Sequence, residues 1–248
     1  MNIVEFLNIE SNKKEMISIV GAGGKTTLLY NISKELKRMY KRILLTTTTH
    51  IYIPPKDVYT DLFLSNSRET LFKYAEAIKD KDLFIIGDSI TKEKKIKGID
   101  ISIADEIYKL GIFDFILIEA DGSKKKPIKA PAEWEPMIPQ MSSMVIGVIG
   151  LDSLGKIVVE DSIHRLKEFC NISECRPGDI INGSMIAKLI KHPKGLFKNT
   201  PEKAEKIALL NKADNGSLIE AGFEIKRMIE DDSIKIVITS MKNNMYWM

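Results

Sequence analysis

The 248-residue sequence predicts an α/β fold in which a mostly parallel sheet is flanked by helices. Short apolar runs recur along the chain and are separated by segments with helical spacing or turn residues, the pattern of alternating strands and helices. Several runs are apolar without alternation, as expected for strands buried on both faces. We expect strands at seven segments: Met16–Val20, Arg42–Thr47, Leu83–Ile86, Phe113–Glu119, Met144–Ile149, Lys206–Leu210 and Ile234–Thr239.

The segments between these runs predict the helices. Thr26–Met39 carries leucines and isoleucines at core-facing spacing. The stretch Gly122–Gln140 holds four prolines and a lysine run, so we expect a long loop beyond a strand end. Further helices are expected at Arg68–Lys79, Ile103–Leu110, Asp161–Cys170, Gly183–Ile190 and Ser217–Glu230.

Length and composition limit the classes of protein. With 44% hydrophobic residues, the chain is expected to form one domain over 1–248, with a small insertion or lid at about 171–201. Lys and Arg total 37 against 34 Asp and Glu, and this net charge of +3 gives no reason to expect a nucleic-acid partner. We find no apolar stretch of membrane-spanning length and no signal-peptide pattern, so we expect no membrane partner and a cytoplasmic location.

The most informative motif is a glycine-rich loop. The strand ISIV runs directly into it and a helical pattern follows, which is the context that a phosphate-binding loop requires. Glycines let backbone N–H groups approach phosphate oxygens, and a helix N-terminus favours negative charge. The sequence therefore predicts a nucleoside-triphosphate site in a P-loop NTPase-like three-layer sandwich, with phosphate-binding residues Gly21, Ala22, Gly23, Gly24, Lys25, Thr26 and Thr27.

The spacing of this loop differs from the standard one. A glycine is expected five positions before Gly24, but Ile19 stands there, so the loop is a short variant. It is similar to the loop of the Mur ligases, and the wider class contains carboxylate-activating enzymes as well as GTPases. We expect Lys25 to reach the terminal phosphates and the Thr26 hydroxyl to bind Mg²⁺.

An acidic partner for the metal follows a neighbouring strand. Glu119 and Asp121 are two residues apart in FDFILIEADGS, so on a strand they point the same way and either can hold Mg²⁺. Asp121 is favoured because Gly122 follows it, and Lys25 and Asp121 are the expected catalytic residues. The two carboxylates also suit an ordinary strand end.

A second motif suggests a base pocket. Asn211, Lys212, Ala213 and Asp214 form the NKxD pattern with which GTPases read guanine, and an Asp carboxylate accepts hydrogen bonds from two guanine donors that adenine lacks. Ser240, after the last predicted strand, resembles the serine-containing loop that completes that pocket. An ordinary strand-to-helix turn explains NKAD equally well, so both ATP and GTP remain candidate ligands beside Mg²⁺.

Other polar residues are expected near the same cleft. TTTTHIYIPP follows the second strand, where ligands bind in such sheets, although threonines also simply favour strands. The lysine run after Asp121 suits an anionic substrate or a solvated face. The further cleft candidates are Thr48, Thr49, His50, Lys124, Lys126, His164 and Arg165.

Together, VGAGGKTTLLY, TTTTHIYIPP, IEADGSKKKPIKAPAEWEPMIP and IGLDSLGK resemble one family. It is the YqeC type of accessory protein for selenium-dependent molybdenum hydroxylases. The resemblance implies a role in maturing those enzymes, with such a hydroxylase as client, and makes the segment around Lys126, Pro131, Trp134 and Glu135 a candidate substrate or partner surface.

Two readings of the function follow. In the first, triphosphate binding or slow hydrolysis switches the Asp121 and Lys124 region of an accessory protein. In the second, an enzyme uses ATP to activate a small-molecule cofactor precursor, as the Mur-ligase-like loop allows. The sequence does not decide whether the chain is a slow NTPase, a cofactor-modifying enzyme or a scaffold.

Overall fold

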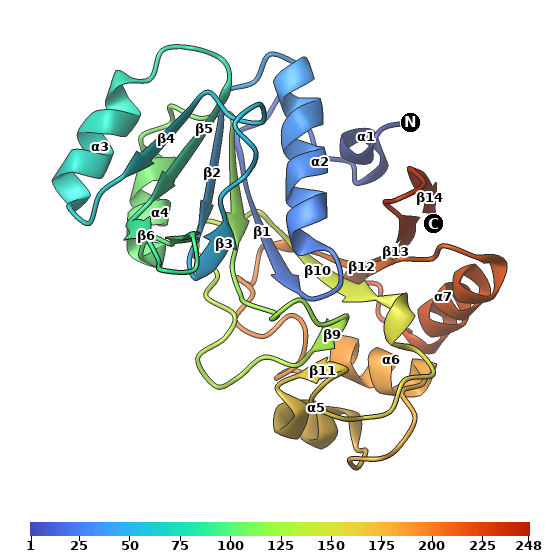
Figure 1. Cartoon of the computed structure of the whole chain (residues 1–248). Coiled ribbons are helices and arrows are strands. Elements are labelled where there is room, and N and C mark those ends of the chain that lie inside the picture. Colours follow the sequence, from blue (N-terminus) through green and yellow to red (C-terminus); the bar gives the residue numbers. More distant parts are fainter.

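The computed structural model describes all 248 residues and is built on one large sheet (Figure 1). Its nine strands lie in the order β14-β13-β12-β10-β1-β8-β2-β5-β4, and only the β13–β14 pair is antiparallel. This confirms the α/β, mostly parallel prediction. The strands are β1 (Glu15–Gly21), β2 (Ile43–Thr47), β4 (Asp61–Leu64), β5 (Leu83–Gly87), β8 (Phe115–Glu119), β10 (Met144–Gly150), β12 (Glu205–Asn211), β13 (Ile234–Ser240) and β14 (Met245–Trp247).

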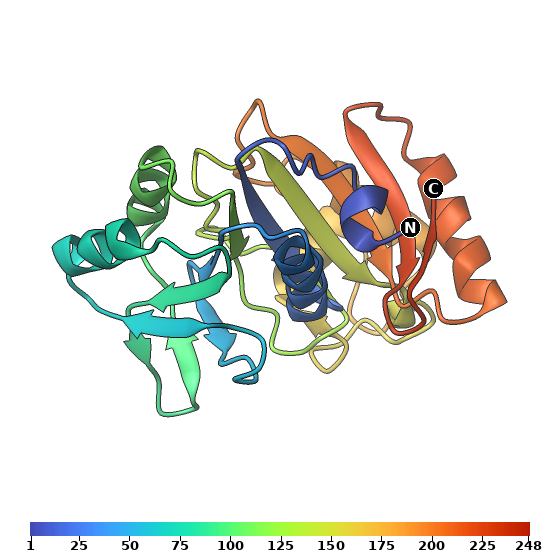
Figure 2. The ribbon, with the colours of Figure 1, turned by 90° about the horizontal axis from the view of Figure 1, so that it is seen from above.

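Helices cover both faces of the sheet, as the view from above shows (Figure 2). Two separate apolar clusters fill the space between the layers because successive residues of a strand point to opposite faces. Ile17 and Ile19 of β1 face α1 (Ile3–Phe6) and α2 (Lys25–Arg38). Met16 and Val20 belong to the other cluster, which includes residues of α3 (Arg68–Ala77), α4 (Ile101–Lys109), α5 (Leu166–Ser173), α6 (Gly183–Lys191) and α7 (Gly216–Met228).

The helix N-termini differ in one respect. Side chains of Ser67, Asp100, Asn182 and Asn215 cap α3, α4, α6 and α7 by accepting first-turn N–H groups. Helix α2 begins after Gly24 and has no side-chain cap. The orphan N–H groups of its first turn therefore need another acceptor, such as water or a ligand.

Two small sheets extend the carboxyl edge of the main sheet. β3 (His50–Tyr52), β7 (Lys95–Lys97) and β6 (Ser89–Ile90) form an antiparallel sheet in the order β3-β7-β6. β9 (Ile128–Lys129) pairs in parallel with β11 (Ile163–His164), and a short 3₁₀ helix, η1 (Leu151–Ser153), follows β10. β9 and β11 lie beneath the carboxyl end of β1 in Figure 1.

The structure corrects some of the expected elements. The helix expected over Asp161–Cys170 is wrong in its first half, because the backbone of Ile163–His164 pairs with β9 and the helix begins only at Leu166. Between them, Arg165 has a left-handed backbone (φ 67°), which separates strand from helix. The loop expected over Gly122–Gln140 contains β9, and the short elements α1, β3, β4, β6, β7 and β14 were not expected.

The segment 171–201 packs on the main body. Ile172, Ile181 and Leu196 belong to the same apolar cluster as the strands of the main sheet. The two termini lie near each other in Figure 1, where the rings of Phe6 and Tyr246 stack with centroids 5.1 Å apart. None of the helices is long and apolar enough to cross a membrane.

Candidate functional site

The glycine-rich loop is held tightly between β1 and α2. Gly23 and Gly24 have φ values of 85° and 141°, a region that residues with a Cβ rarely adopt. A Cβ on Gly23 would lie 2.3 Å from Gly150 N, and one on Gly24 would lie 2.3 Å from Asn211 Nδ2. The neighbouring Gly21 N–H donates to Asp121 Oδ2 at 3.0 Å. Glycine is therefore required both by the backbone conformation and by close neighbours.

Lys25 is buried beneath this loop among carboxylates. Its Nζ donates to Gly21 O at 2.7 Å and lies 3.1 Å from Asp121 Oδ1 and 3.8 Å from Glu119 Oε1. Burial disfavours the ammonium, but Asp121 and Glu119 outweigh it and raise the pKa of Lys25. The positive charge is thus kept at the end of β1 before any ligand arrives.

Thr26 and the two carboxylates present oxygen atoms to one point. Thr26 Oγ1 donates to Glu119 Oε2 at 2.9 Å. Burial raises the pKa of Glu119, and Lys25 opposes part of that rise. Asp121 Oδ1 is buried and accepts no hydrogen bond. A buried carboxylate oxygen without a hydrogen-bond donor, beside a hydroxyl and a second carboxylate, fits the all-oxygen ligand set of Mg²⁺.

Lys129 and Glu135 form a buried ion-pair network that sequence reasoning missed. Lys129 Nζ lies 3.1 Å from both Asp121 Oδ2 and Glu135 Oε2 and donates to Gly122 O at 2.7 Å. Burial opposes ionisation of Glu135, but Lys129 holds its pKa below the usual range. Arg165 Nε is 3.4 Å from Glu135 Oε2, and its guanidinium lies over the Trp134 ring at 5.2 Å. The network therefore joins Asp121 to an aromatic ring that is 63% exposed.

A signal for this network exists in the sequence. Lys129 stands between Ile128 and Ala130, followed by Pro131 and Ala132, and all of these residues are buried. A lysine within an apolar run indicates a buried and paired ammonium. Within the surface expected around Lys126, Pro131, Trp134 and Glu135, only Trp134 is exposed.

The NKAD loop contacts the glycine-rich loop directly. Asn211 Nδ2 donates to Gly23 O at 2.8 Å, while Asn211 Oδ1 accepts from Thr239 Oγ1 at 3.1 Å. Ser240 Oγ donates to the exposed Asp214 carboxylate at 2.5 Å. Lys212 Nζ is instead 2.9 Å from Asp152 Oδ2. Asn211 fixes the loop, and Asp214 and Ser240 lie together at its outer side.

The remaining candidates fall into two groups. Thr48 Oγ1 donates to Met137 O at 2.7 Å, so its hydroxyl serves a backbone contact. Thr27, Thr49, His50, Lys124, Lys126, His164 and Arg165 line one cavity together with Lys25 and Thr26. Lys126 Nζ donates to Asp161 O at 2.7 Å at the rim.

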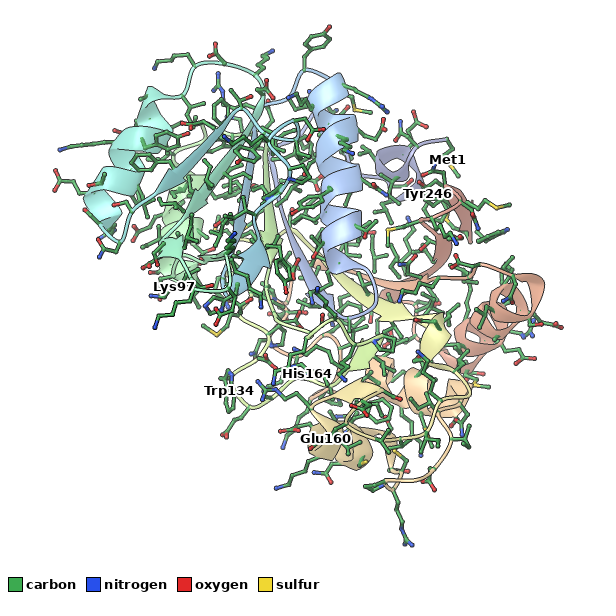
Figure 3. All side chains as sticks on the ribbon, viewed as in Figure 1. Met1, Lys97, Trp134, Glu160, His164 and Tyr246 are labelled. Atoms are coloured by element: carbon green, nitrogen blue, oxygen red, sulfur yellow. The ribbon has the colours of Figure 1, made fainter.

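This cavity, of about 1110 Å³, opens at the carboxyl edge of the main sheet. Asn211, Asp214 and Ser240 do not line it. Figure 3 places His164 inward and Trp134 outward in the segment beneath β1. Burial and the charges of Lys129 and Arg165 lower the pKa of His164 to about 4, so its ring is neutral near pH 7.

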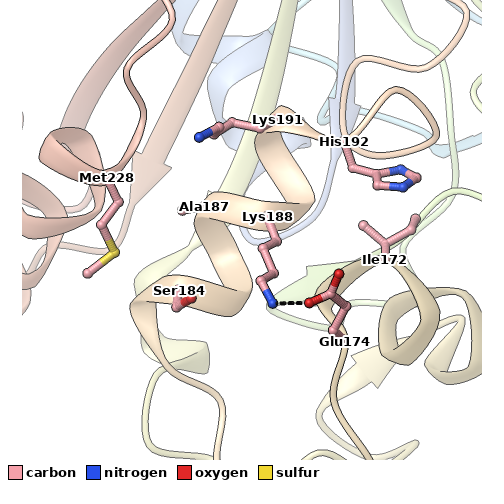
Figure 4. A pocket seen from close by; sticks show the side chains of 8 residues that line it. All are labelled: Ile172, Glu174, Ser184, Ala187, Lys188, Lys191, His192 and Met228. Atoms are coloured by element: carbon pink, nitrogen blue, oxygen red, sulfur yellow. Dashed lines mark hydrogen bonds and ion pairs between the residues drawn. The ribbon is translucent and has the colours of Figure 1, made fainter.

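A smaller hollow of about 390 Å³ lies between α6 and the ends of α5 and α7 (Figure 4). Its polar contact is an ion pair between the exposed Lys188 and Glu174. It contains no glycine-rich turn and no buried charged group. The cavity at the glycine-rich loop is therefore the candidate functional site.

Comparison with known proteins gives two matches. The family model described as YqeC protein matches residues 17–167. The chain is also 31% identical over 222 residues to "Uncharacterized protein YqeC" of Escherichia coli (strain K12), covering 90% of this chain and 85% of that protein. The matched family region contains the glycine-rich loop, the two carboxylates and the Lys129–Glu135–Arg165 network.

Proposed function

The chain belongs to the YqeC family, and from its site we propose that it binds Mg²⁺ and a nucleoside triphosphate, with GTP preferred over ATP. One observation carries this proposal. Lys25, Thr26 and the Glu119–Asp121 pair meet at the uncapped N-terminus of α2, directly behind a loop of strained glycines. Such a combination of free N–H groups, ammonium and oxygen ligands suits a polyphosphate with a divalent cation.

Each of these residues has a distinct task. The loop and α2 N–H groups accept phosphate oxygens, and the Lys25 ammonium, held by Asp121 and Gly21 O, lies where terminal phosphates add negative charge. The Thr26 hydroxyl and the Asp121 and Glu119 carboxylates would hold Mg²⁺, which neutralises phosphate charge when bound. The charged groups are already fixed, so binding needs little reorganisation.

The base preference rests on the second loop. Asn211 ties that loop to Gly23, which sets the distance between the phosphate and base positions. Asp214 is exposed and hydrogen-bonded by Ser240, so its second carboxylate oxygen is available to guanine donors. Adenine lacks this donor pair, and GTP is therefore the favoured nucleotide.

The buried network favours an accessory role over simple storage of nucleotide. Asp121 contacts Lys129, Lys129 contacts Glu135, and Glu135 contacts Arg165 beneath the exposed Trp134. A change in the charge on Asp121 alters every later pair, so Mg²⁺ and γ-phosphate can change the surface around Trp134. We propose this surface as the contact with a selenium-dependent molybdenum hydroxylase client.

Calorimetric titration with GTP, ATP and CTP in Mg²⁺ tests nucleotide binding. We expect GTP to bind about 10- to 100-fold more tightly than ATP, the range of one or two charged hydrogen bonds. Lys25→Ala should remove binding of every nucleotide, and Asp214→Asn should remove only the preference for GTP. Lys109→Ala and Asp232→Asn, at exposed positions elsewhere, serve as matched controls.

The outcomes separate the alternatives. Equal binding of ATP and GTP that survives Asp214→Asn would refute the guanine pocket and favour the ATP-dependent activating enzyme. Absence of binding by any nucleotide would refute the nucleotide site altogether.

The accessory role has its own measurement. In a Trp247→Phe background, Trp134 is the only tryptophan. Its fluorescence should change when Mg²⁺ and GTP are added, and Glu135→Gln should suppress the change without abolishing GTP binding. An unchanged signal in the Trp247→Phe protein, measured while GTP is bound, would contradict the proposed switch.

A further inference from the structure

The cavity extends well beyond the glycine-rich loop. The residues that would contact a base, Asp214 and Ser240, lie outside it, so only the phosphate end of a nucleotide enters. At the other end the lining is made by β3, β7 and the segment after Asp121, including Tyr52 and Lys95. Since pockets of roughly 300–1000 Å³ suffice for a whole drug-sized ligand, about 1110 Å³ leaves room beside the phosphates.

The cavity also concentrates the positive charge of the chain. Its lining holds seven Lys or Arg and three Glu, an excess of four positive charges, and Asp121 beneath the loop reduces this to three. The whole chain carries +3 with neutral histidine, so the rest of the molecule is neutral on balance. Such a concave, one-sign surface attracts anions.

Three of these cations are not used by the proposed nucleotide site. Lys124 and Lys125 make no ion pair, whereas the next residue, Lys126, lies 3.7 Å from Asp161 Oδ1. The Nζ atoms of Lys95 and Lys125 each lie 4.9 Å from the centroid of the Tyr52 ring. One aromatic ring thus holds two ammonium groups from different segments close together, although like charges repel.

The backbone of this region is strained. Lys124 and Lys125 have φ values of 48° and 60°, and Arg165 and Lys212 in the same lining have 67° and 64°. A left-handed backbone at a residue other than glycine costs about 1–3 kcal/mol and tends to occur at ligand sites. The strain here directs cationic residues to one cavity.

From this geometry we infer that the end of the cavity formed by Lys95, Lys124, Lys125 and Tyr52 is a second binding site, which takes the phosphate group of a small molecule beside the nucleotide. The chemistry favours phosphate over carboxylate because lysine ammonium groups bind phosphate as point charges, whereas carboxylates pair best with the planar fork of arginine. The inference rests on the proposed function in one respect, that nucleotide phosphates fill the loop end.

Pyrophosphate is a suitable probe because it carries the group without a nucleoside. Calorimetric titration into protein saturated with Mg²⁺ and a non-hydrolysable GTP analogue should show one pyrophosphate site. The double variant Lys124→Ala/Lys125→Ala should weaken that site by at least about tenfold, while leaving affinity for the GTP analogue within about twofold, since neither lysine belongs to the nucleotide site. The matched control Lys79→Ala/Lys81→Ala removes two exposed lysines elsewhere and should leave both affinities unchanged.

Further arms keep the outcome decisive. Lys124→Arg/Lys125→Arg should retain pyrophosphate binding, which excludes misfolding as the cause of the loss. Citrate binding as tightly as pyrophosphate, or pyrophosphate binding unaffected by the double alanine variant, would overturn the inference. If the GTP analogue does not bind, pyrophosphate is titrated into Lys25→Ala. Binding there that depends on Lys124 and Lys125 would support the second site alone.

Discussion

The two ends of the cavity hold their cations in opposite ways. At the loop end, Lys25 and Lys129 are 3% and 1% exposed and each contacts Asp121. At the far end, Lys95 and Lys125 reach solvent and contact only the Tyr52 ring. Buried charges must be paired in the folded state, whereas solvated charges need no partner. The loop end is therefore rigid before binding, and the far end keeps its charge free for a ligand.

The largest expected effect comes from the buried end. Lys129→Ala leaves Asp121 and Glu135 buried without their shared ammonium, so the free energy of unfolding should fall by about 3–5 kcal/mol. Urea denaturation followed by circular dichroism measures it. Lys73→Ala, which breaks an exposed ion pair with Glu69, is the control and should cost less than about 1 kcal/mol. Equal losses in the two variants would remove the distinction between the ends.

A smaller effect is expected where the two loops meet. Asn211→Ala removes the hydrogen bond to Gly23 O and leaves the Thr239 hydroxyl without its acceptor, so unfolding should become easier by about 1–3 kcal/mol. The same variant should weaken GTP and ATP alike, because it displaces the loop and not a base contact. Exposed Asn243→Ala is the control. A variant that loses only GTP would instead place Asn211 at the base.

His164 joins the two ends and makes stability depend on pH. Burial and the charges of Lys129 and Arg165 lower its pKa to about 4, against a weaker opposing effect of Glu135. The folded state therefore favours the neutral ring, which contributes stability above about pH 6.5 that is lost as pH falls toward 4. Between pH 7 and 4.5, wild type should lose about 1 kcal/mol more than His164→Gln. Exposed His192→Gln should follow wild type, and identical pH profiles for all three would contradict the assignment.

The strands of the sheet could be predicted because their signal is local. Met16–Val20 and Ile234–Thr239 are apolar runs long enough to show burial on both faces, and each forms a strand. The position of Lys25 beside Asp121 follows from the parallel pairing of β1 with β8, since both residues come at carboxyl ends. A glycine-rich loop between a strand and a helix also gives a local pattern.

What could not be predicted depends on contacts between distant segments. Ile163–His164 continues a helical pattern in sequence, but its backbone pairs with Ile128–Lys129, which no local propensity reveals. That pairing buries Lys129 and brings it to Asp121. The pair of lysines over Tyr52 likewise depends on β7 lying beside β3, and each lysine alone reads as a solvated side chain.

The smallest expected effect on stability belongs to the far end, and it sharpens the comparison most. Lys95→Ala/Lys125→Ala removes two exposed ammonium groups that repel each other across Tyr52, so the free energy of unfolding should change by no more than about 0.5 kcal/mol. Pyrophosphate should raise the melting temperature of wild type but not of this variant, because a ligand stabilises only the protein that binds it. A large loss of stability in the variant without ligand would mean that these lysines serve the fold. The far end would then be built like the loop end, with its charges already used.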